Sequence, residues 1–118
     1  MLYKTKRGKD MIEHVRLSIL LGIYGSLLTE RQLEILDNYY NDDMSLTEIA
    51  EKFDISRQAV LDNVKKGEKK LLEYEEKLHI LSDHESRKNK IDKIQDILSN
   101  KITQKDIDTI NKLLKQID

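Results

Sequence analysis

The most specific side-chain chemistry in the sequence lies at Arg57, Gln58 and Leu61. An arginine guanidinium can donate two parallel hydrogen bonds to guanine, a glutamine amide can pair with adenine, and an apolar side chain can contact the methyl group of thymine. These three residues therefore form the centre of a candidate DNA-contacting set. The neighbouring side chains that complete this set are Thr47, Ser56, Asp62, Lys65 and Lys66.

The outer members of the set have less specific roles. The hydroxyl groups of Thr47 and Ser56 can bond phosphate oxygens, and the two lysines can neutralise phosphate charge further along the helix. Asp62 would repel phosphate. For each of these side chains the alternative is an ordinary solvated surface residue. Whether they contact DNA therefore depends on the structural element to which they belong.

That element is predicted to be a helix-turn-helix over residues 46–66. Two short helices that cross steeply need a small residue at the crossing and a turn residue that tolerates left-handed backbone. Ala50 and Asp54 supply them, although glycine is the usual turn residue. The alternative is that a small helical domain shows this spacing without binding nucleic acid.

Polar residues that cap helices mark both starts of the motif. Ser45 and Glu48 form a Ser-x-x-Glu capping box before the first helix, and Ser56 can cap the second. The apolar residues expected to converge between the two helices are Ile49, Phe53, Ile55, Val60 and Val64.

The second helix of the motif is predicted to be long. Apolar or small residues continue at alternating spacings of four and three, which favours one helix from Arg57 to Leu81 with a heptad seam. The seam consists of Val60, Val64, Gly67, Leu71, Tyr74, Leu78 and Leu81. It must pack either on helices of the same chain or on the same helix of a second copy, and we expect a homodimer.

The rest of the chain is also predicted to be helical. We expect a basic arm over residues 1–10, which either contacts phosphates or is a solvated terminus, then a buried helix from Met11. A Thr29-x-x-Gln32 capping box opens the next helix, in which Tyr39 and Tyr40 either stack on bases or, as we expect, belong to the core.

The polar segment 82–89 is predicted to be a turn or hinge, and it is followed by two amphipathic helices, the second capped by Thr103-x-x-Asp106. We therefore expect a helix-turn-helix domain over residues 1–81 and a C-terminal helical hairpin over 82–118. Charged residues make up 36% of the 118 residues, aromatics 5%, and proline is absent, so the expected fold class is all-α.

Composition also limits location and chemistry. The chain has no cysteine, its longest apolar run is Ile19–Leu21, and its first residues lack the apolar region of a signal peptide. We expect a cytoplasmic protein that does not insert into membranes.

Residues with catalytic or metal-binding chemistry are scattered. His14, His79 and His84 have no partner at ligand spacing, and the adjacent acids of Glu75-Glu76 point apart on a helix. No phosphate-binding loop, nucleophile elbow or dinucleotide motif is present. The prediction is that the chain is not an enzyme and has no metal, cofactor or small-molecule substrate.

The charge distribution is uneven. Five basic against two acidic residues give +3 over residues 1–28, eight against thirteen give −5 over 29–77, and eight against seven give +1 over 78–118. An acidic helix-turn-helix segment is a weak nonspecific DNA binder, because affinity depends on neutralised phosphates. The second helix is nevertheless locally basic. The basic residues on it are Arg57, Lys65, Lys66, Lys69 and Lys70.

The strings SLTEIAEK and FDISRQAV, which span residues 45–60, resemble region 4 of bacterial sigma factors, in which aspartate also takes the turn position. The longer segment Ile23–Leu78 is similar to the YlxM-like family of small bacterial proteins, through the strings LLTERQ, YYNDDMSLTEIA and SRQAV-x-DN. Leu61 stands where an aromatic residue is common.

This resemblance implies a helix-turn-helix like that of sigma region 4, a regulatory role, and a link to the signal recognition particle pathway through gene neighbourhood. We expect a DNA-binding regulator that acts as a homodimer. The alternative is an adaptor that binds a protein or RNA component of the signal recognition particle, with its acidic surface facing a basic partner.

Overall fold

A computed structural model describes the backbone of residues 8–117 and the side chains from Met11 onward. Over these residues the chain is helical and contains no strand, which confirms the predicted all-α class. None of these helices is both long and apolar enough to cross a lipid bilayer. The elements are α1 (Gly8–Tyr24), the 3-10 turn η1 (Gly25–Leu27), α2 (Glu30–Tyr40), α3 (Leu46–Phe53), α4 (Arg57–Leu78), α5 (Ile80–Leu98) and α6 (Gln104–Lys115).

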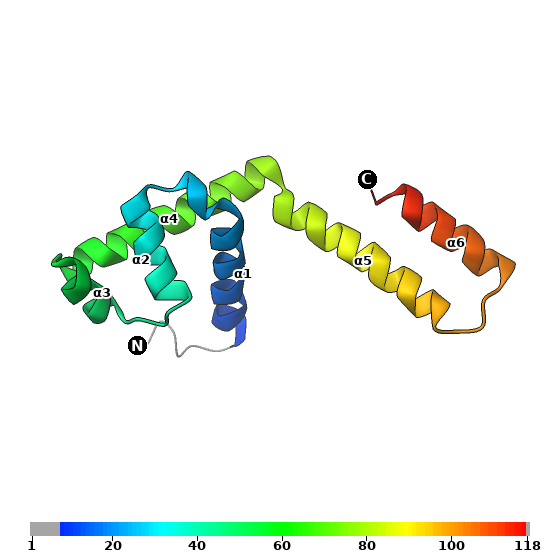
Figure 1. Ribbon diagram of the computed structural model, residues 1–118, viewed down its shortest axis with the longest axis horizontal. Helices are drawn as coiled ribbons and strands as arrows, with labels where there is room; N and C mark the ends of the chain where they lie inside the picture. Colours follow the sequence, from blue (N-terminus) through cyan, green and yellow to red (C-terminus); the bar gives the residue numbers. More distant parts are fainter. Residues whose placement is uncertain (1–7, 118) are drawn as a thin grey trace. The chain divides into compact units, whose positions relative to one another are not determined.

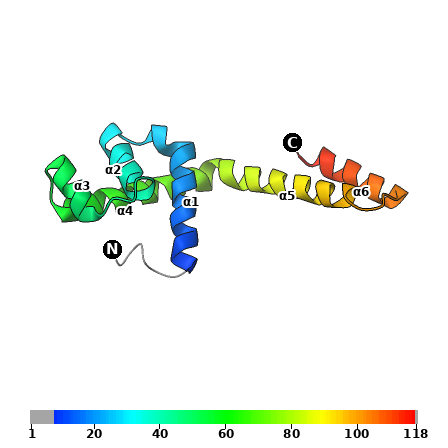
Figure 2. The same cartoon turned by 60° about the horizontal axis from the view of Figure 1, so that its bottom comes forward.

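The helices form two units, one ending at Leu78 and one beginning at His79. In the first unit α4 is the central element, and α1, α2 and α3 all pack against it (Figure 1). Figure 2 shows the same arrangement from another side, with α1 lying across α4. The core contains residues from all four helices. Its largest fully buried side chains are Leu20, Tyr24, Ile35, Leu36, Tyr39, Ile49, Val60 and Leu71.

From Val60 to Leu71 the heptad seam of α4 is covered by helices of the same chain, whereas Leu78 at its end is 51% exposed. Val60, Val64 and Leu71 are at most 2% exposed, and the elements against them are α1, α2 and α3. Gly67 allows α4 to pack closely against α2, because a Cβ atom there would lie 2.6 Å from Leu36 Cδ1. The seam therefore gives no reason by itself to expect a second copy.

A buried polar pair joins α1 to α4. The hydroxyl group of Tyr24 donates a hydrogen bond to Glu75 Oε1 at 2.7 Å, and both residues are less than 9% exposed. Tyr39 and Tyr40 are also buried, which confirms that they belong to the core. The imidazole of His14 lies against Tyr40, with ring centroids 4.7 Å apart.

Three predicted element boundaries need correction. The first helix begins at Gly8 rather than Met11, so the end of the predicted arm is helical, while residues 1–7 lie outside the described residues. The long helix ends at Leu78 rather than Leu81, because His79 adopts left-handed backbone with φ 54°. The predicted hinge over residues 82–89 is wrong, since this segment lies inside α5.

Capping agrees with the sequence in most places. Thr103 and Asp106 form a complete capping box at the start of α6. At the start of α2 only half of the predicted box forms: Thr29 Oγ1 accepts a hydrogen bond from Gln32 N at 3.2 Å, whereas Gln32 Oε1 accepts from Lys70 Nζ at 3.4 Å. The buried Gln32 therefore links α2 to α4 instead of closing its own cap.

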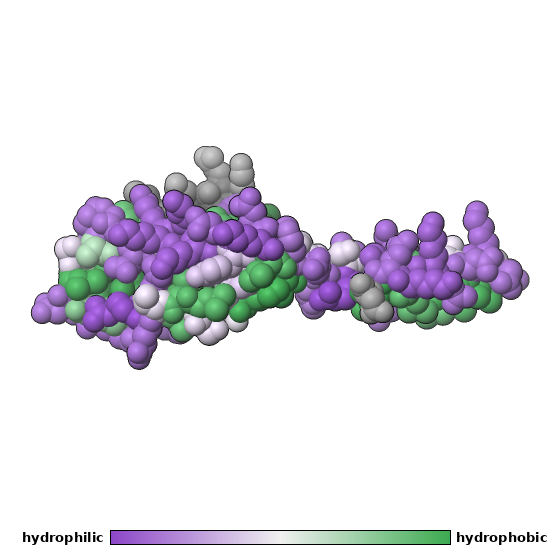
Figure 3. Space-filling view, turned by 90° about the horizontal axis from the view of Figure 1, so that it is seen from above, coloured by the Kyte–Doolittle hydropathy of each residue, from purple (hydrophilic) through white to green (hydrophobic). Residues whose placement is uncertain are grey.

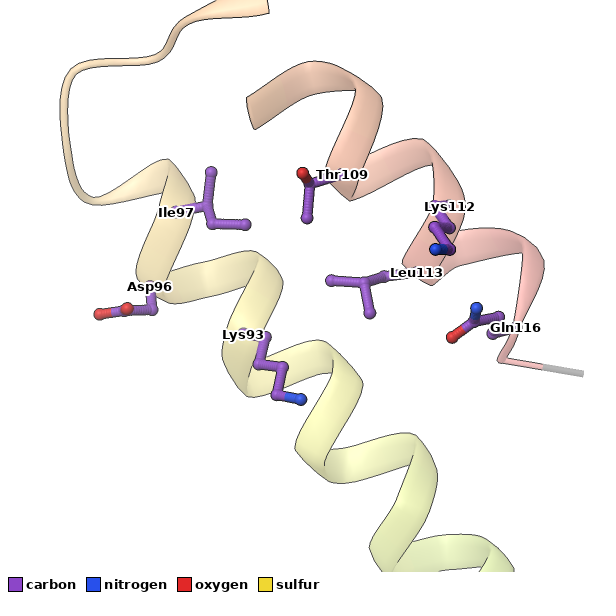
Figure 4. Close-up of a pocket in the computed structure, with 7 residues that line it drawn as sticks. All are labelled: Lys93, Asp96, Ile97, Thr109, Lys112, Leu113 and Gln116. Carbon is purple, nitrogen blue, oxygen red and sulfur yellow. The ribbon is translucent and has the colours of Figure 1, made fainter. Parts of the chain in front are cut away.

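The second unit is a hairpin of α5 and α6, joined by a short loop (Figure 1). Lys90 Nζ donates a hydrogen bond to the carbonyl oxygen of Gln116 at 2.8 Å. One side of the hairpin has an open groove of about 430 Å³, where Ile97 and Leu113 point toward one another (Figure 4). The residues that line the groove are Lys93, Asp96, Ile97, Thr109, Lys112, Leu113 and Gln116.

Candidate nucleic-acid interface

The turn between α3 and α4 has the geometry that the sequence predicted. Asp54 lies in the left-handed region with φ 54° and ψ 47°. The backbone N–H of Ile55 donates to the carbonyl oxygen of Ala50 at 3.0 Å, which satisfies a carbonyl at the end of α3. Ala50 is 8% exposed, so its small side chain lies inside the motif, where α3 packs on α4. The helix-turn-helix is therefore present.

Side-chain caps fix where both helices of the motif begin. Ser45 Oγ accepts from Glu48 N at 3.1 Å, and Glu48 Oε1 accepts from Ser45 N at 3.0 Å, which completes the predicted capping box. Ser56 Oγ accepts from Ala59 N at 3.0 Å at the start of α4. These caps place Arg57 and Gln58 in the first turn of α4.

The structure brings the predicted DNA-contacting residues to the surface. Arg57 and Gln58 are exposed, and Leu61, one turn later, is half-buried. Among the described residues Arg57 makes no hydrogen bond or ion pair, so its guanidinium is free to contact a ligand. The other predicted residues are all exposed: Thr47, Ser56, Asp62, Lys65 and Lys66.

Gln58 differs from Arg57 because its amide already has a partner. Gln58 Nε2 donates a hydrogen bond to Asp62 Oδ1 at 3.0 Å, one turn further along α4. Gln58 Oε1 and the second hydrogen on Nε2 remain available to pair with adenine, because the amide has two donor hydrogens and Asp62 accepts only one of them. Asp62 therefore restrains the orientation of the Gln58 amide, and it also adds negative charge to this surface.

The exposed charges around the start of α4 have both signs. Four lysines lie on the outer surface of α4, whereas α3 and the turn contribute exposed carboxylates at Glu51 and Asp54. A phosphate approaching Arg57 would meet the attraction of the lysines and the repulsion of these carboxylates. The lysines are Lys65, Lys66, Lys69 and Lys70.

Residues of α2 support the motif, although no sequence pattern identified them. Lys52 Nζ, on α3, donates to Asn38 Oδ1 at 2.7 Å and lies 3.9 Å from Glu34 Oε1. Asn38 is 4% exposed, and its carbonyl oxygen accepts from Met44 N at 3.0 Å. Asn38 therefore holds both α3 and the segment leading into it.

A cation–π contact lies at the same C-terminal end of α3 as Lys52. The guanidinium carbon of Arg31, on α2, lies 4.7 Å from the centroid of the Phe53 ring. Phe53 was expected on the inner face of α3, but it is only half-buried, because this exposed arginine covers its ring instead of the core. These side-chain contacts between α2 and α3 join residues 14 or more positions apart, a distance over which helical periodicity carries no information.

Comparison with known proteins places this arrangement in a family. A family model described as "Putative helix-turn-helix protein, YlxM / p13 like" matches residues 11–113, which is most of the chain. A UPF0122 protein of Clostridium kluyveri is 50% identical over 95 residues, which cover 77% of this chain and 86% of that protein.

Two further relatives agree with this match. A UPF0122 protein of Halalkalibacterium halodurans is 44% identical over 93 residues, covering 79% of this chain and 85% of the relative. A UPF0122 protein of Bacillus cereus strain AH187 is 42% identical over 102 residues, covering 86% and 87%. The similarity extends across the helix-turn-helix and into the hairpin.

Proposed function

The chain belongs to the YlxM / p13-like family of helix-turn-helix proteins, and from this membership we propose that it is a cytoplasmic DNA-binding regulator. The family is one of helix-turn-helix proteins rather than enzymes. The observation that carries the proposal is the exposed first turn of α4, capped by Ser56 and braced by α3.

The proposed contacts follow from the position of each side chain on the motif. Arg57 donates two hydrogen bonds to guanine, Gln58 pairs with adenine through Oε1 and its second amide hydrogen, and Leu61 contacts a thymine methyl group. Hydroxyl groups and lysines outside this centre bind phosphates and set the register of the protein on the duplex. These outer residues are Thr47, Ser56, Lys65 and Lys66.

Selection from random duplexes with the purified full chain tests this function. An enriched sequence should bind with an affinity that falls steeply as salt rises, and Lys65→Ala should reduce the slope of that dependence by about one. Arg57→Ala should weaken binding by about 10-fold or more, because a bidentate contact to guanine contributes about 1–3 kcal/mol.

Lys77→Ala is the matched control for Arg57→Ala. It removes one positive charge from the exposed last turn of the same helix. Equal losses for the two variants would mean that only net charge matters, and no enriched duplex at low salt would refute DNA binding.

A second candidate is an adaptor that binds a protein or RNA component of the signal recognition particle. The observation that favours it is the excess of five negative charges over residues 29–77, the segment that contains the motif. An acidic surface suits a basic protein partner better than it suits phosphate. Co-purification of a particle component from lysate, without any duplex binding at low salt, would support this candidate over the first.

We also propose that the chain acts as a homodimer, although not through the part of the α4 seam from Val60 to Leu71, which the chain covers itself. Two helix-turn-helix motifs in one assembly would contact two half-sites on a duplex. Duplexes enriched by selection should then contain a repeated or palindromic half-site.

A further inference from the structure

The hairpin of α5 and α6 lacks a core of its own. No residue of α6 is buried, and Leu81 is the only buried residue of α5. Two helices of this length are not stable in water without apolar burial, because packing rather than helix propensity supplies most helical stability. A further surface must therefore cover part of this hairpin in the folded protein.

The apolar residues of the hairpin fall into two rows. The inner row is half-buried and joins α5 to α6, with Ile94 and Ile97 on one helix and Ile110 and Leu113 on the other. The outer row is more exposed: Ile91 43%, Leu98 53%, Ile107 43% and Leu114 52%. The hairpin thus uses one row and leaves the other uncovered.

The two helices carry related eight-residue segments, which are identical at four positions and similar at two more. Residues 91–98 are IDKIQDIL and residues 107–114 are IDTINKLL, so both rows occupy the same positions in each repeat. The exposures of the outer row agree with this equivalence, since 43% and 53% on α5 correspond to 43% and 52% on α6. The two helices therefore offer a partner equivalent pairs of exposed apolar side chains.

The outer row occupies a single face of the hairpin. In each helix the outer residues are displaced by roughly 80° in the same rotational sense from the inner row, at 100° per residue. Because α5 and α6 run in opposite directions, equal displacements in the same sense bring both outer pairs to the same side. Figure 3 shows hydrophobic surface along one edge of the hairpin, beneath a mostly hydrophilic remainder.

We propose that this face, made of Ile91, Leu98, Ile107 and Leu114, docks on the same face of a second copy to form a four-helix bundle. The packing that already joins α5 to α6 through the inner row can be repeated between copies, because the two helices present equivalent residues. Four helices packed in this way bury their aliphatic residues in one shared core.

Charge and composition fit a second copy as the occupant. The face is bordered by two neutral amides. Gln95 lies between Ile91 and Leu98, and Asn111 lies between Ile107 and Leu114. Amide side chains from two copies can contact one another without charge repulsion. Residues 79–118 contain eight basic and seven acidic residues, so two hairpins repel one another little. Methionine and aromatic residues, which adaptable binding surfaces favour, are absent from this segment.

A second exposed apolar row lies on α1, but the first unit has a hydrophobic core without it. Met11, Ile12, Val15 and Ile19 are 46–71% exposed, while the opposite side of α1 is anchored by Leu17, Leu20 and Leu21. The first unit already has a core from four helices, whereas the hairpin has none. The α1 row therefore provides the matched control.

Sedimentation equilibrium of the full chain without DNA tests the proposal. The wild-type protein should be a dimer at micromolar concentration, and Leu98→Gln with Leu114→Gln should raise the dissociation constant by at least about 100-fold, because four partly buried leucines are lost per dimer. Val15→Gln with Ile19→Gln should change it by less than about threefold. A monomeric wild type, or a dimer that dissociates only in the α1 variant, would overturn the proposal.

Single cysteines give a test that leaves the aliphatic rows intact, since the chain has no cysteine of its own. A short bis-maleimide that spans about one interhelical distance, about 8–10 Å, should link two copies of Gln95→Cys. Lys93→Cys, which lies in the groove on the other side, should give little product. Equal yields would contradict the proposal. It rests on the proposed homodimer but not on DNA binding, which is measured separately with duplexes.

Discussion

Gly67 is a position at which α4 packs tightly against Leu36 of α2. A Cβ atom there would lie 2.6 and 2.7 Å from the two methyl carbons of Leu36, which is itself fully buried. Gly67→Ala should therefore lower the free energy of unfolding by about 1 kcal/mol, because overpacking of about 1–3 kcal/mol exceeds the helix-propensity gain of about 1 kcal/mol. Urea denaturation measures the difference.

Gly22→Ala is the control for this prediction. Gly22 also lies inside a helix, but a Cβ atom there would have no neighbour within 4 Å. This variant should gain about 0.5–1 kcal/mol from helix propensity alone. Equal and stabilising effects at both glycines would show that the contact between α2 and α4 is looser than described.

Asp62 offers a residue-level test of which ligand the motif binds. Asp62→Asn removes a charge that repels phosphate while keeping an oxygen that can accept from Gln58. If DNA is the ligand, affinity should rise about threefold, since a unit charge about 7 Å from a phosphate in water contributes about 0.6 kcal/mol. Fluorescence anisotropy with an enriched duplex measures this. Unchanged or weaker binding would count against phosphate contact on this side of α4.

At the scale of elements, α3 depends on its N-terminal cap. Ser45→Ala removes the oxygen that accepts from Glu48 N and should lower the free energy of unfolding by about 1 kcal/mol. The same substitution at Thr103, which caps α6, should not affect the first unit. Near-ultraviolet circular dichroism of tyrosine during denaturation follows the first unit, because all five tyrosines precede His79. A loss at Thr103→Ala as large as that at Ser45→Ala would contradict this separation.

The sequence was most informative where a single residue type satisfies a local need. Ser45 with Glu48, and Asp54 in left-handed backbone, were predicted because capping and turn geometry involve residues close together in the chain. The break at His79 could not be predicted in this way. No glycine or proline marks it, and the polar segment 82–89 that suggested a hinge is a part of α5 in which every residue is exposed.

The heptad seam shows a second limit of sequence interpretation. Spacing alone says that Val60, Val64 and Leu71 share one side of a helix, but not whether the covering helix belongs to the same chain. The adjacent acids Glu75 and Glu76 point apart as predicted, the first buried and the second exposed. That Glu75 meets Tyr24, 51 positions earlier, could not be inferred from local spacing.

At the scale of the whole molecule, the two units should unfold differently. Because the hairpin is proposed to be stable only when paired, its thermal transition should rise with protein concentration, as mass action requires. The first unit has its own core, so its transition should not move. Helix content at 222 nm reports both units, whereas tyrosine signals report only the first.

A 20-fold change in concentration should therefore separate the two signals. The 222 nm curve should shift in its hairpin component while the tyrosine curve stays in place. A single transition, seen equally by both signals and independent of concentration, would contradict both the separation of the units and the pairing of hairpins.

The hydrogen bond between Tyr24 and Glu75 has a consequence for where the protein presents Arg57. If α4 shifted by one turn along α1, the carboxylate of Glu75 would be buried among apolar residues without the hydroxyl group of Tyr24. This would cost several kcal/mol. Such a penalty leaves α4 only one register against α1. Arg57 lies five turns away on the same helix. The position of its guanidinium on the protein surface is therefore determined by this buried hydrogen bond.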